Sequence, residues 1–210
     1  MMNNMKEKMI KTGTTGLAFR YNDGILIAAD MRVSAGYVVG KDIDKVHMIA
    51  PNIGMAISGL VSDAMALIDL MKSELKLFEY DNGYKPTVKV ASSLLGLICH
   101  NSFRSMMPFW VQLIVGGVDD NGSHLYSIDP SGAVQEDDYM VIGSGSLFSL
   151  SIIEDNWKEC MTKDDARELA KRALRISISR DLYTGDGMNL FFITKEGLER
   201  EKVKLKSVEE

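Results

Sequence analysis

The chain has 210 residues, of which 46% are hydrophobic and 25% are charged, and it carries a net charge of −5. This length and composition are those of one globular domain, and they argue against a disordered, coiled-coil or collagen-like chain. The acidic balance offers no broad basic surface that would attract nucleic acid.

The first quarter of the chain is predicted to be mostly β-structure. Residues 14–20 alternate weakly, and the turn sequence Asn22-Asp23-Gly24 leads into an apolar run over 24–30, which predicts a hairpin. Because the second run is apolar at successive positions, we expect a strand that is covered on both faces. Two more strands are predicted at 45–50 and 53–58.

Helices and strands then follow in blocks. Apolar residues recur with helical spacing from Leu60 to Phe78, and again over 88–103 after a break at 81–83. Strands are predicted at 111–115, 125–128 and 139–142, helices at 146–157 and 162–181, and a last strand at 189–194. Segregated blocks of this kind predict an α+β domain in which helices cover two packed sheets.

The common catalytic and metal-binding patterns are missing from the sequence. It contains no GxSxG elbow, HExxH pair or Walker A loop. The three histidines, His47, His100 and His124, are isolated from any candidate nucleophile. We therefore expect no histidine-based triad, no metal site and no cofactor.

The sequence also carries information on cellular location. No apolar run approaches the roughly 20 residues that a membrane helix requires. The two cysteines, Cys99 and Cys160, form no CxxC pair, which favours a reducing cytoplasm. Residues 1–13 are too polar for a secretory signal and lack the arginine and serine of an organellar presequence, so they require another explanation.

Seven short motifs follow one another along the chain. They are Gly13-Thr14-Thr15, Ala29-Asp30-Met31-Arg32, Ser58-Gly59-Leu60-Val61-Ser62-Asp63-Ala64, Val111-Gln112-Leu113-Ile114-Val115-Gly116-Gly117, Tyr126-Ser127-Ile128-Asp129, Gly143-Ser144-Gly145-Ser146, and Arg180-Asp181 before Thr184-Gly185. In this order they resemble the β-subunits of the 20S proteasome of the archaeal type, which are N-terminal nucleophile hydrolases. The resemblance covers the chain from Gly13 to about Phe192.

The resemblance implies a fold, a maturation step and an activity. The fold would be a four-layer αββα sandwich, with two packed antiparallel sheets covered by helices. Residues 1–13 would be a propeptide removed by self-cleavage between Gly13 and Thr14, which leaves a catalytic domain over 14–210. The mature chain would be a threonine endopeptidase that hydrolyses unfolded polypeptide in a chamber of two heptameric β-rings, capped by α-subunit rings and fed by an AAA-type ATPase.

The chemistry of threonine agrees with this interpretation. A threonine hydroxyl is a weak nucleophile until a base removes its proton, and a threonine at a chain terminus carries a base in its own α-amine, whose ordinary pKa is about 7.7–8.0. The amine exists only after the bond between Gly13 and Thr14 is cut. Residues 1–13 would therefore keep the enzyme silent as a zymogen.

The resemblance also implies the catalytic residues. Asp30 and Lys45 would form a buried charged pair beside Thr14, in which Lys45 lowers the pKa of the amine and assists proton transfer. The backbone N–H of Gly59 would bind the developing oxyanion. The groups that orient the amine and hold the catalytic water would be Ser144, Asp181 and Thr184.

Substrate-binding residues follow from the same resemblance. The backbone of Ser34 would pair with the extended substrate as an added strand. Val33, Ile57 and Val61, together with Gly59, would form the primary specificity pocket. Because the three side chains are apolar, cleavage after hydrophobic residues is predicted.

Several of these assignments have a simpler alternative. Asp30 would instead pair with Arg32 at the strand end, Gly59 would be a helix-start glycine, and the pocket side chains would belong to the core. Ser144 and Asp181 would be an ordinary loop residue and a solvated carboxylate.

The identity of the lysine is also open. The segment from Asp30 to Lys45 is one residue shorter than is usual in the family, and Asp44-Lys45 stands where a Lys-Lys pair is common. Lys41 is therefore the alternative to Lys45.

Two other classes of protein remain as alternatives for the whole chain. A non-catalytic structural β-ring subunit would fold in the same way, but such subunits typically lose the Gly-Thr junction or the charged pair, and this chain has both. The hexameric bacterial protease and small-molecule amidases share the fold. The length of the chain after Gly13, the 143–146 turn and the Arg180-Asp181 segment favour the 20S type.

Overall fold

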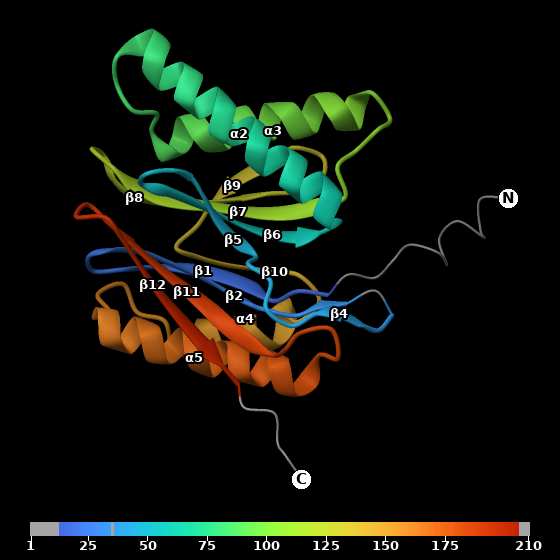
Figure 1. The fold of residues 1–210 in the computed structure, drawn as a ribbon. Helices are drawn as coiled ribbons and strands as arrows, with labels where there is room; N and C mark the ends of the chain where they lie inside the picture. Colours follow the sequence, from blue (N-terminus) through green and yellow to red (C-terminus); the bar gives the residue numbers. More distant parts are fainter. Residues whose placement is uncertain (1–12, 35, 206–210) are drawn as a thin grey trace, which may run out of the picture.

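Two five-stranded antiparallel sheets lie face to face at the centre of the molecule (Figure 1). The computed structural model describes residues 13–34 and 36–205. The first sheet has the spatial order β10 (Tyr139–Ile142), β1 (Gly16–Tyr21), β2 (Gly24–Asp30), β11 (Gly187–Thr194) and β12 (Leu198–Lys204). The second has the order β5 (Val46–Ala50), β6 (Ile53–Gly59), β7 (Val111–Asp119), β8 (Gly122–Ile128) and β9 (Val134–Glu136).

Two helices cover the outer face of each sheet, so that the chain forms four layers (Figure 1). The helices on the second sheet are α2 (Val61–Asn82) and α3 (Val88–Arg104), and those on the first sheet are α4 (Ser146–Asn156) and α5 (Lys163–Arg180). A short hairpin of β3 (Val33–Ser34) and β4 (Val38–Gly40) projects from one end of the sandwich. This architecture confirms the expected α+β fold with two packed antiparallel sheets covered by helices.

Strand β2 explains why the layers hold together. Ile25 and Ile27 pack in the space between the two sheets, whereas Leu26 and Ala28 pack against the helix layer that contains α5. All seven residues of β2 are buried, as expected for a strand that is apolar at successive positions. Each large side chain buried in this way contributes roughly 1.5–3 kcal/mol.

Most predicted elements are present, with ends that differ by a few residues. The prediction that 189–194 is the last strand is wrong, because β12 follows it and pairs with β11 from Ile193 opposite Leu198 to Gly187 opposite Lys204. Strand β12 has the sequence LEREKVK, which lacks an apolar face, and it is an edge strand held partly by ion pairs from α5 to Glu201. Strands β3, β4 and β9 were also not predicted, because each has only two or three residues.

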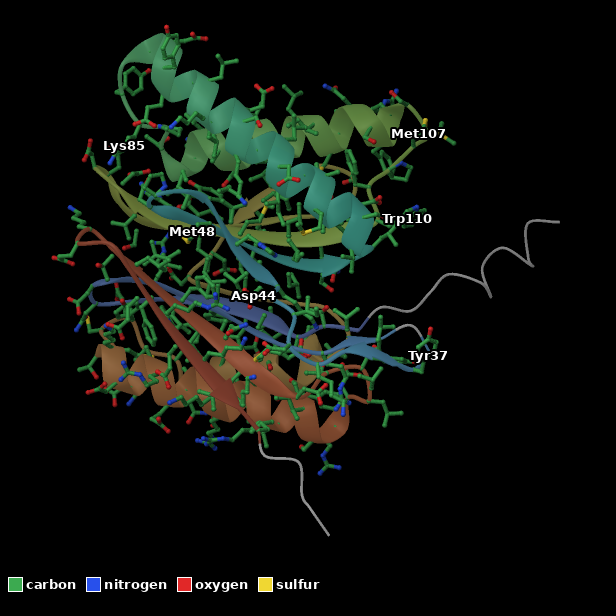
Figure 2. All side chains as sticks on the ribbon, viewed as in Figure 1. Tyr37, Asp44, Met48, Lys85, Met107 and Trp110 are labelled. Carbon is green, nitrogen blue, oxygen red and sulfur yellow. The ribbon has the colours of Figure 1, made fainter. Side chains whose placement is uncertain are left out.

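One end of the sandwich gathers the strand ends that carry the expected site residues. Thr14 lies just before β1, Asp30 ends β2 opposite Met188 of β11, and Gly59 ends β6 opposite Val111. Figure 2 shows Tyr37 and Trp110 on this side of the molecule, at the β3–β4 hairpin and near the start of β7.

Among the helices of the described residues, none combines the length and the apolar character needed to span a membrane.

Candidate active site

The bond between Gly13 and Thr14 lies in an enclosed position. Thr14 is 5% exposed, and its Oγ1 hydroxyl donates a hydrogen bond of 2.8 Å to the carbonyl oxygen of Gly13. Nζ of Lys45 donates to the same oxygen over 3.2 Å. Gly13 admits no side chain, because a Cβ at this residue would lie 1.6 Å from Cβ of Tyr183. The hydroxyl of the candidate nucleophile and the lysine ammonium therefore meet at one atom, the carbonyl oxygen of Gly13.

Asp30 and Lys45 form an ion pair in the interior. Nζ of Lys45 lies 2.7 Å from Oδ1 of Asp30, and the two side chains are 4% and 0% exposed. Three backbone N–H groups also donate to the carboxylate, those of Thr15, Arg32 and Gly185, over 2.9, 3.0 and 2.9 Å. Four donors on two oxygens compensate the loss of hydration that a buried carboxylate suffers.

Burial changes the protonation behaviour of both partners. Removal from water raises the pKa of Asp30, while the Lys45 ammonium and the backbone donors oppose this rise. The same removal from water lowers the pKa of Lys45, and the neighbouring Asp30 opposes that fall. A lysine with a lowered pKa releases its proton more readily, which suits a group that exchanges protons with its neighbours.

The sequence left two alternatives to this pair: Arg32 as the partner of Asp30, and Lys41 in place of Lys45. Arg32 forms its ion pair with Asp186, with 2.7 Å between Nε and Oδ2, and meets the Asp30 carboxylate through its own backbone N–H. Lys41 is exposed, whereas Lys45 contacts Asp30 directly. The structure thus brings Lys45 to the Thr14 region.

A chain of hydroxyls and one carboxylate lies on the other side of Thr14. The backbone N–H of Thr14 donates to Oγ of Ser144 over 3.3 Å, and Ser144 donates to Oδ2 of Asp181 over 2.5 Å. Thr184 donates to the same carboxylate oxygen over 2.6 Å and shares a hydrogen bond of 2.9 Å with the hydroxyl of Thr15. Thr184 therefore reaches Thr15 directly, and Thr15 is a member of this chain that sequence reasoning missed.

Glycines in the turn between β10 and α4 allow this close approach. Gly143 has a φ of +92°, and a Cβ there would lie 2.1 Å from the carbonyl oxygen of Thr14. A Cβ on Gly145 would lie 2.1 Å from Oγ1 of Thr15. Packing therefore requires glycine at both positions, and the turn places Ser144 against the backbone of Thr14.

A cavity of about 50 Å³ lies beside Thr14. The residues expected to form the specificity pocket all lie on its wall, namely Val33, Ile57, Gly59 and Val61. Gly13, Thr14 and Lys45 also line the cavity. Sequence reasoning did not assign the remaining lining residues to the pocket, which are Ile43, Asp44, Ser58, Ala64 and Met65. Ala64 and Met65 follow Val61 by three and four residues, a spacing that places all three on one face of α2 and could have identified them.

Gly59 occupies a position that only glycine fits. Its φ is +116°, and a Cβ would lie 2.2 Å from the carbonyl oxygen of Trp110. The N–H of Leu60 donates to that same oxygen over 2.8 Å, which fixes the turn from β6 into α2. The backbone of Gly59 therefore borders the cavity in a rigid turn.

Ser34 stands outside the cavity lining. It lies in β3, where it pairs with Val38 of β4, and it is 3% exposed. Within the described part of the chain, its buried hydroxyl has no hydrogen-bond partner.

The histidines lie outside this group of residues. His47 and His100 each contact a backbone oxygen, and His124 contacts the carboxylate of Glu136. Over residues 13–34 and 36–205, no group of three or more His, Cys, Asp or Glu side chains has an arrangement that could hold a metal ion.

Comparison with known proteins gives consistent matches over almost the whole chain. Residues 10–193 match the family model described as "Proteasome subunit". The chain is 41% identical over 206 residues to "Proteasome subunit beta 2" of Sulfurisphaera tokodaii, which covers 96% of this chain and 97% of that protein. It is 40% identical over 186 residues to "Proteasome subunit beta 2" of Thermofilum pendens, with 88% and 90% covered. The "Proteasome subunit beta" of Haloferax volcanii is 38% identical over 194 residues, which are 92% of this chain and 78% of that protein.

Proposed function

Because this chain belongs to the proteasome family, as a β-subunit of the archaeal type, we propose that it is a threonine endopeptidase whose nucleophile is Thr14. Residues 1–13 are then a propeptide that the chain removes itself, and residues 14–210 are the catalytic domain.

One observation carries the proposal, the pair of hydrogen bonds on the carbonyl oxygen of Gly13. The hydroxyl that would attack this carbonyl lies 2.8 Å from its oxygen, and Nζ of Lys45 donates to that oxygen over 3.2 Å. A cation on a carbonyl oxygen draws electron density from the carbon and stabilises the negative charge that develops during attack. The ion pair with Asp30 accounts for the burial of Lys45, and the additional contact with the Gly13 carbonyl oxygen supports a role at this peptide bond.

Self-cleavage would proceed in two steps. Oγ1 of Thr14 bonds to the carbonyl carbon of Gly13, the C–N bond between Gly13 and Thr14 breaks, and the hydroxyl proton ends on the nitrogen of Thr14. The products of this step are an ester at Oγ1 and a free α-amine. Water then hydrolyses the ester, which releases residues 1–13 with a terminal carboxylate and restores the hydroxyl.

Each later turnover would use the new α-amine as the base. The amine takes the proton of Oγ1 as the hydroxyl attacks a substrate carbonyl, and the proton passes to the leaving amine of the product. The backbone N–H of Gly59 binds the oxyanion, and the same α-amine activates the water that hydrolyses the acyl ester. The chain of Ser144, Asp181 and Thr184 orients the amine and holds this water.

The lining of the cavity supports a preference for hydrophobic residues before the cleaved bond. Val33, Ile57 and Val61 present apolar side chains to the cavity. The carboxylate of Asp44, on the same wall, already accepts hydrogen bonds from Arg200 and Asn189, so a charged substrate side chain would lose its hydration there without a free partner. Met65 adds a flexible apolar side chain that adapts to substrates of different size. Ser34, at the base of the projecting hairpin, would pair through its backbone with the extended substrate.

Family membership also supports the place of this chain in an assembly. Proteasome β-subunits form rings that stack with α-subunit rings. We propose that the β-rings are heptameric, that the particle acts in the cytoplasm, and that an AAA-type ATPase supplies it with unfolded polypeptide. A non-catalytic ring subunit would fold in the same way, so the activity itself must be tested.

The test is the intact mass of the chain in the particle formed on co-expression with the α-subunit of the same organism. We expect wild type to lack residues 1–13 and to hydrolyse a fluorogenic peptide that ends in tyrosine before the cleaved bond. Thr14→Ala should keep residues 1–13 and show no hydrolysis, while Thr87→Ala, at the start of α3, should behave as wild type. If wild type retained residues 1–13 in an assembled particle, the chain would be a structural subunit. If Thr14→Ala hydrolysed the peptide, the nucleophile would be a different residue.

A further inference from the structure

The loop between α5 and β11 carries two of the proposed site residues, Asp181 and Thr184. It contains no regular secondary structure. Asp186 near its end has a φ of +66°, a left-handed conformation that residues other than glycine seldom adopt and that aspartate and asparagine tolerate best. Such a conformation persists where surrounding contacts impose it.

Arg32 supplies those contacts. Its Nε and Nη2 donate to the two carboxylate oxygens of Asp186 over 2.7 and 3.3 Å, and its Nη1 donates to the carbonyl oxygen of Leu182 over 3.1 Å. The guanidinium also lies against Gly185, where a Cβ would be 2.4 Å from Cζ of Arg32. One planar side chain thus touches the loop at three places.

The backbone around Arg32 ties the same loop to the buried carboxylate. The N–H groups of Arg32 and Gly185 both donate to Oδ2 of Asp30, over 3.0 and 2.9 Å. The N–H of Met31 donates to the carbonyl oxygen of Gly185 over 3.2 Å. The end of β2 and this loop are therefore joined by both side-chain and backbone contacts.

We propose that Arg32 and Asp186 form a clamp that holds the loop so that Asp181 and Thr184 meet the Thr14–Thr15 segment. Arg32 is thus a positioning residue, because its side chain touches the loop and not the nucleophile. This inference rests on the proposed function, since the clamp matters for the reaction of Thr14.

The geometry indicates that orientation is the main contribution of the clamp. The side chains of Arg32 and Asp186 are 25% and 16% exposed, and partly exposed ion pairs contribute little to stability by charge alone. A guanidinium offers two parallel donors to a carboxylate and a further donor to a carbonyl, which a lysine ammonium cannot reproduce in the same plane. Displacement of catalytic groups by about 1 Å lowers rates by about 10²-fold.

The test uses Arg32→Met, Arg32→Lys and Asp186→Asn in the particle co-expressed with the α-subunit. Asp186→Asn keeps a residue that tolerates the left-handed conformation while it removes the charge. The matched control is Arg20→Met, because Arg20 is 30% exposed and pairs with Glu136 and Asp138 at the other end of β1. Readouts are kcat and KM on the tyrosine peptide, the melting temperature, and hydrogen exchange of residues 181–187.

For Arg32→Met we expect kcat to fall about 10²-fold with KM within about twofold of wild type. Arg32→Lys and Asp186→Asn should give intermediate values, and exchange over 181–187 should be faster in all three variants. Arg20→Met should match wild type in kcat and in this exchange. Equal melting temperatures for Arg32→Met and Arg20→Met would exclude a merely structural effect.

Two results would overturn the clamp: kcat of Arg32→Met equal to that of Arg20→Met, or unchanged exchange over 181–187. Failure of the proposed function is seen separately, because wild type would then neither remove residues 1–13 nor hydrolyse the peptide. The exchange experiment still tests the clamp in that case, because it does not depend on activity.

Discussion

Replacement of Lys45 by methionine separates the chemistry of the site from its packing. Methionine has nearly the same length and fills the buried space, but it removes the ammonium that contacts both Asp30 and the carbonyl oxygen of Gly13. We expect self-cleavage of Lys45→Met to slow by about 10²–10³-fold, the usual cost of one lost donor to a developing oxyanion, so that particles retain residues 1–13. These particles should hydrolyse no peptide, because the α-amine that serves as the base is not formed without cleavage.

The same change should also lower the free energy of unfolding, and the contacts that Asp30 keeps determine by how much. Removal of one partner of a buried ion pair costs about 3–5 kcal/mol, because the other charge is left without compensation. Three backbone donors to the carboxylate remain after the substitution, so we expect a value near the lower end, about 3 kcal/mol at neutral pH.

The pH dependence has a definite sign. Without Lys45, burial raises the pKa of Asp30 further above its ordinary value, because the opposing ammonium is gone. A raised pKa adds stability below the unfolded value, about 3.9, and this stability is lost as the pH rises through the folded value. The destabilisation of Lys45→Met relative to wild type should therefore be smallest near pH 4 and should grow toward neutral pH.

Intact mass, peptide hydrolysis and denaturant unfolding at several pH values measure these effects. Lys41→Met is the matched control, since it removes an exposed lysine from the same segment. If Lys41→Met were the inactive variant and Lys45→Met were processed normally, the reasoning on the buried pair would be refuted.

Two further predictions concern the cavity. Gly59→Ala should lower kcat by about 10²–10³-fold because its Cβ displaces the proposed oxyanion donor, whereas Gly83→Ala, which is also left-handed at +74° but has open space around it, should lower stability and leave kcat unchanged. Equal kcat values for the two variants would contradict the oxyanion role. Val61→Asp should change the preference between two peptides, one with tyrosine and one with lysine before the cleaved bond. The kcat/KM of the tyrosine peptide divided by that of the lysine peptide should fall by at least about tenfold, and an unchanged ratio would place the specificity pocket elsewhere.

The sequence predicted the layered core well because the pattern of apolar residues determines it. The run of β2 is apolar at successive positions and the stripe from Leu60 to Phe78 has a helical period, and both elements are present. Strand β12 has neither pattern, because its residues are mostly exposed and charged. Its place beside β11 depends on hydrogen bonds and on partners in α5, which a pattern along one segment does not contain.

The candidate site shows a similar division. The motifs pointed to Thr14, Asp30 and Ser144, and the family resemblance pointed to Lys45 with Lys41 as the alternative. The structure brings Thr14, Asp30, Lys45 and Ser144 together. The motifs and the resemblance did not reveal Thr15, which contributes both a hydroxyl to Thr184 and a backbone N–H to Asp30. Thr15 and Thr184 are 169 residues apart in the sequence, so only the folded structure shows that their hydroxyls meet.

Cleavage at Gly13 would both create the base and adjust its strength. Before cleavage the nitrogen of Thr14 is an amide that donates to Ser144, and Lys45 donates to the carbonyl oxygen of Gly13. After cleavage that acceptor would leave with residues 1–13, and the new α-amine would lie near the Lys45 ammonium, because Lys45 contacts the carbonyl oxygen beside it. A neighbouring positive charge disfavours a second one, which lowers the pKa of the amine below its ordinary range of about 7.7–8.0. In the profile of kcat/KM against pH, the acid limb of the mature enzyme should therefore have its midpoint below pH 7.7. A midpoint at or above pH 8 would show that Lys45 does not keep the amine neutral.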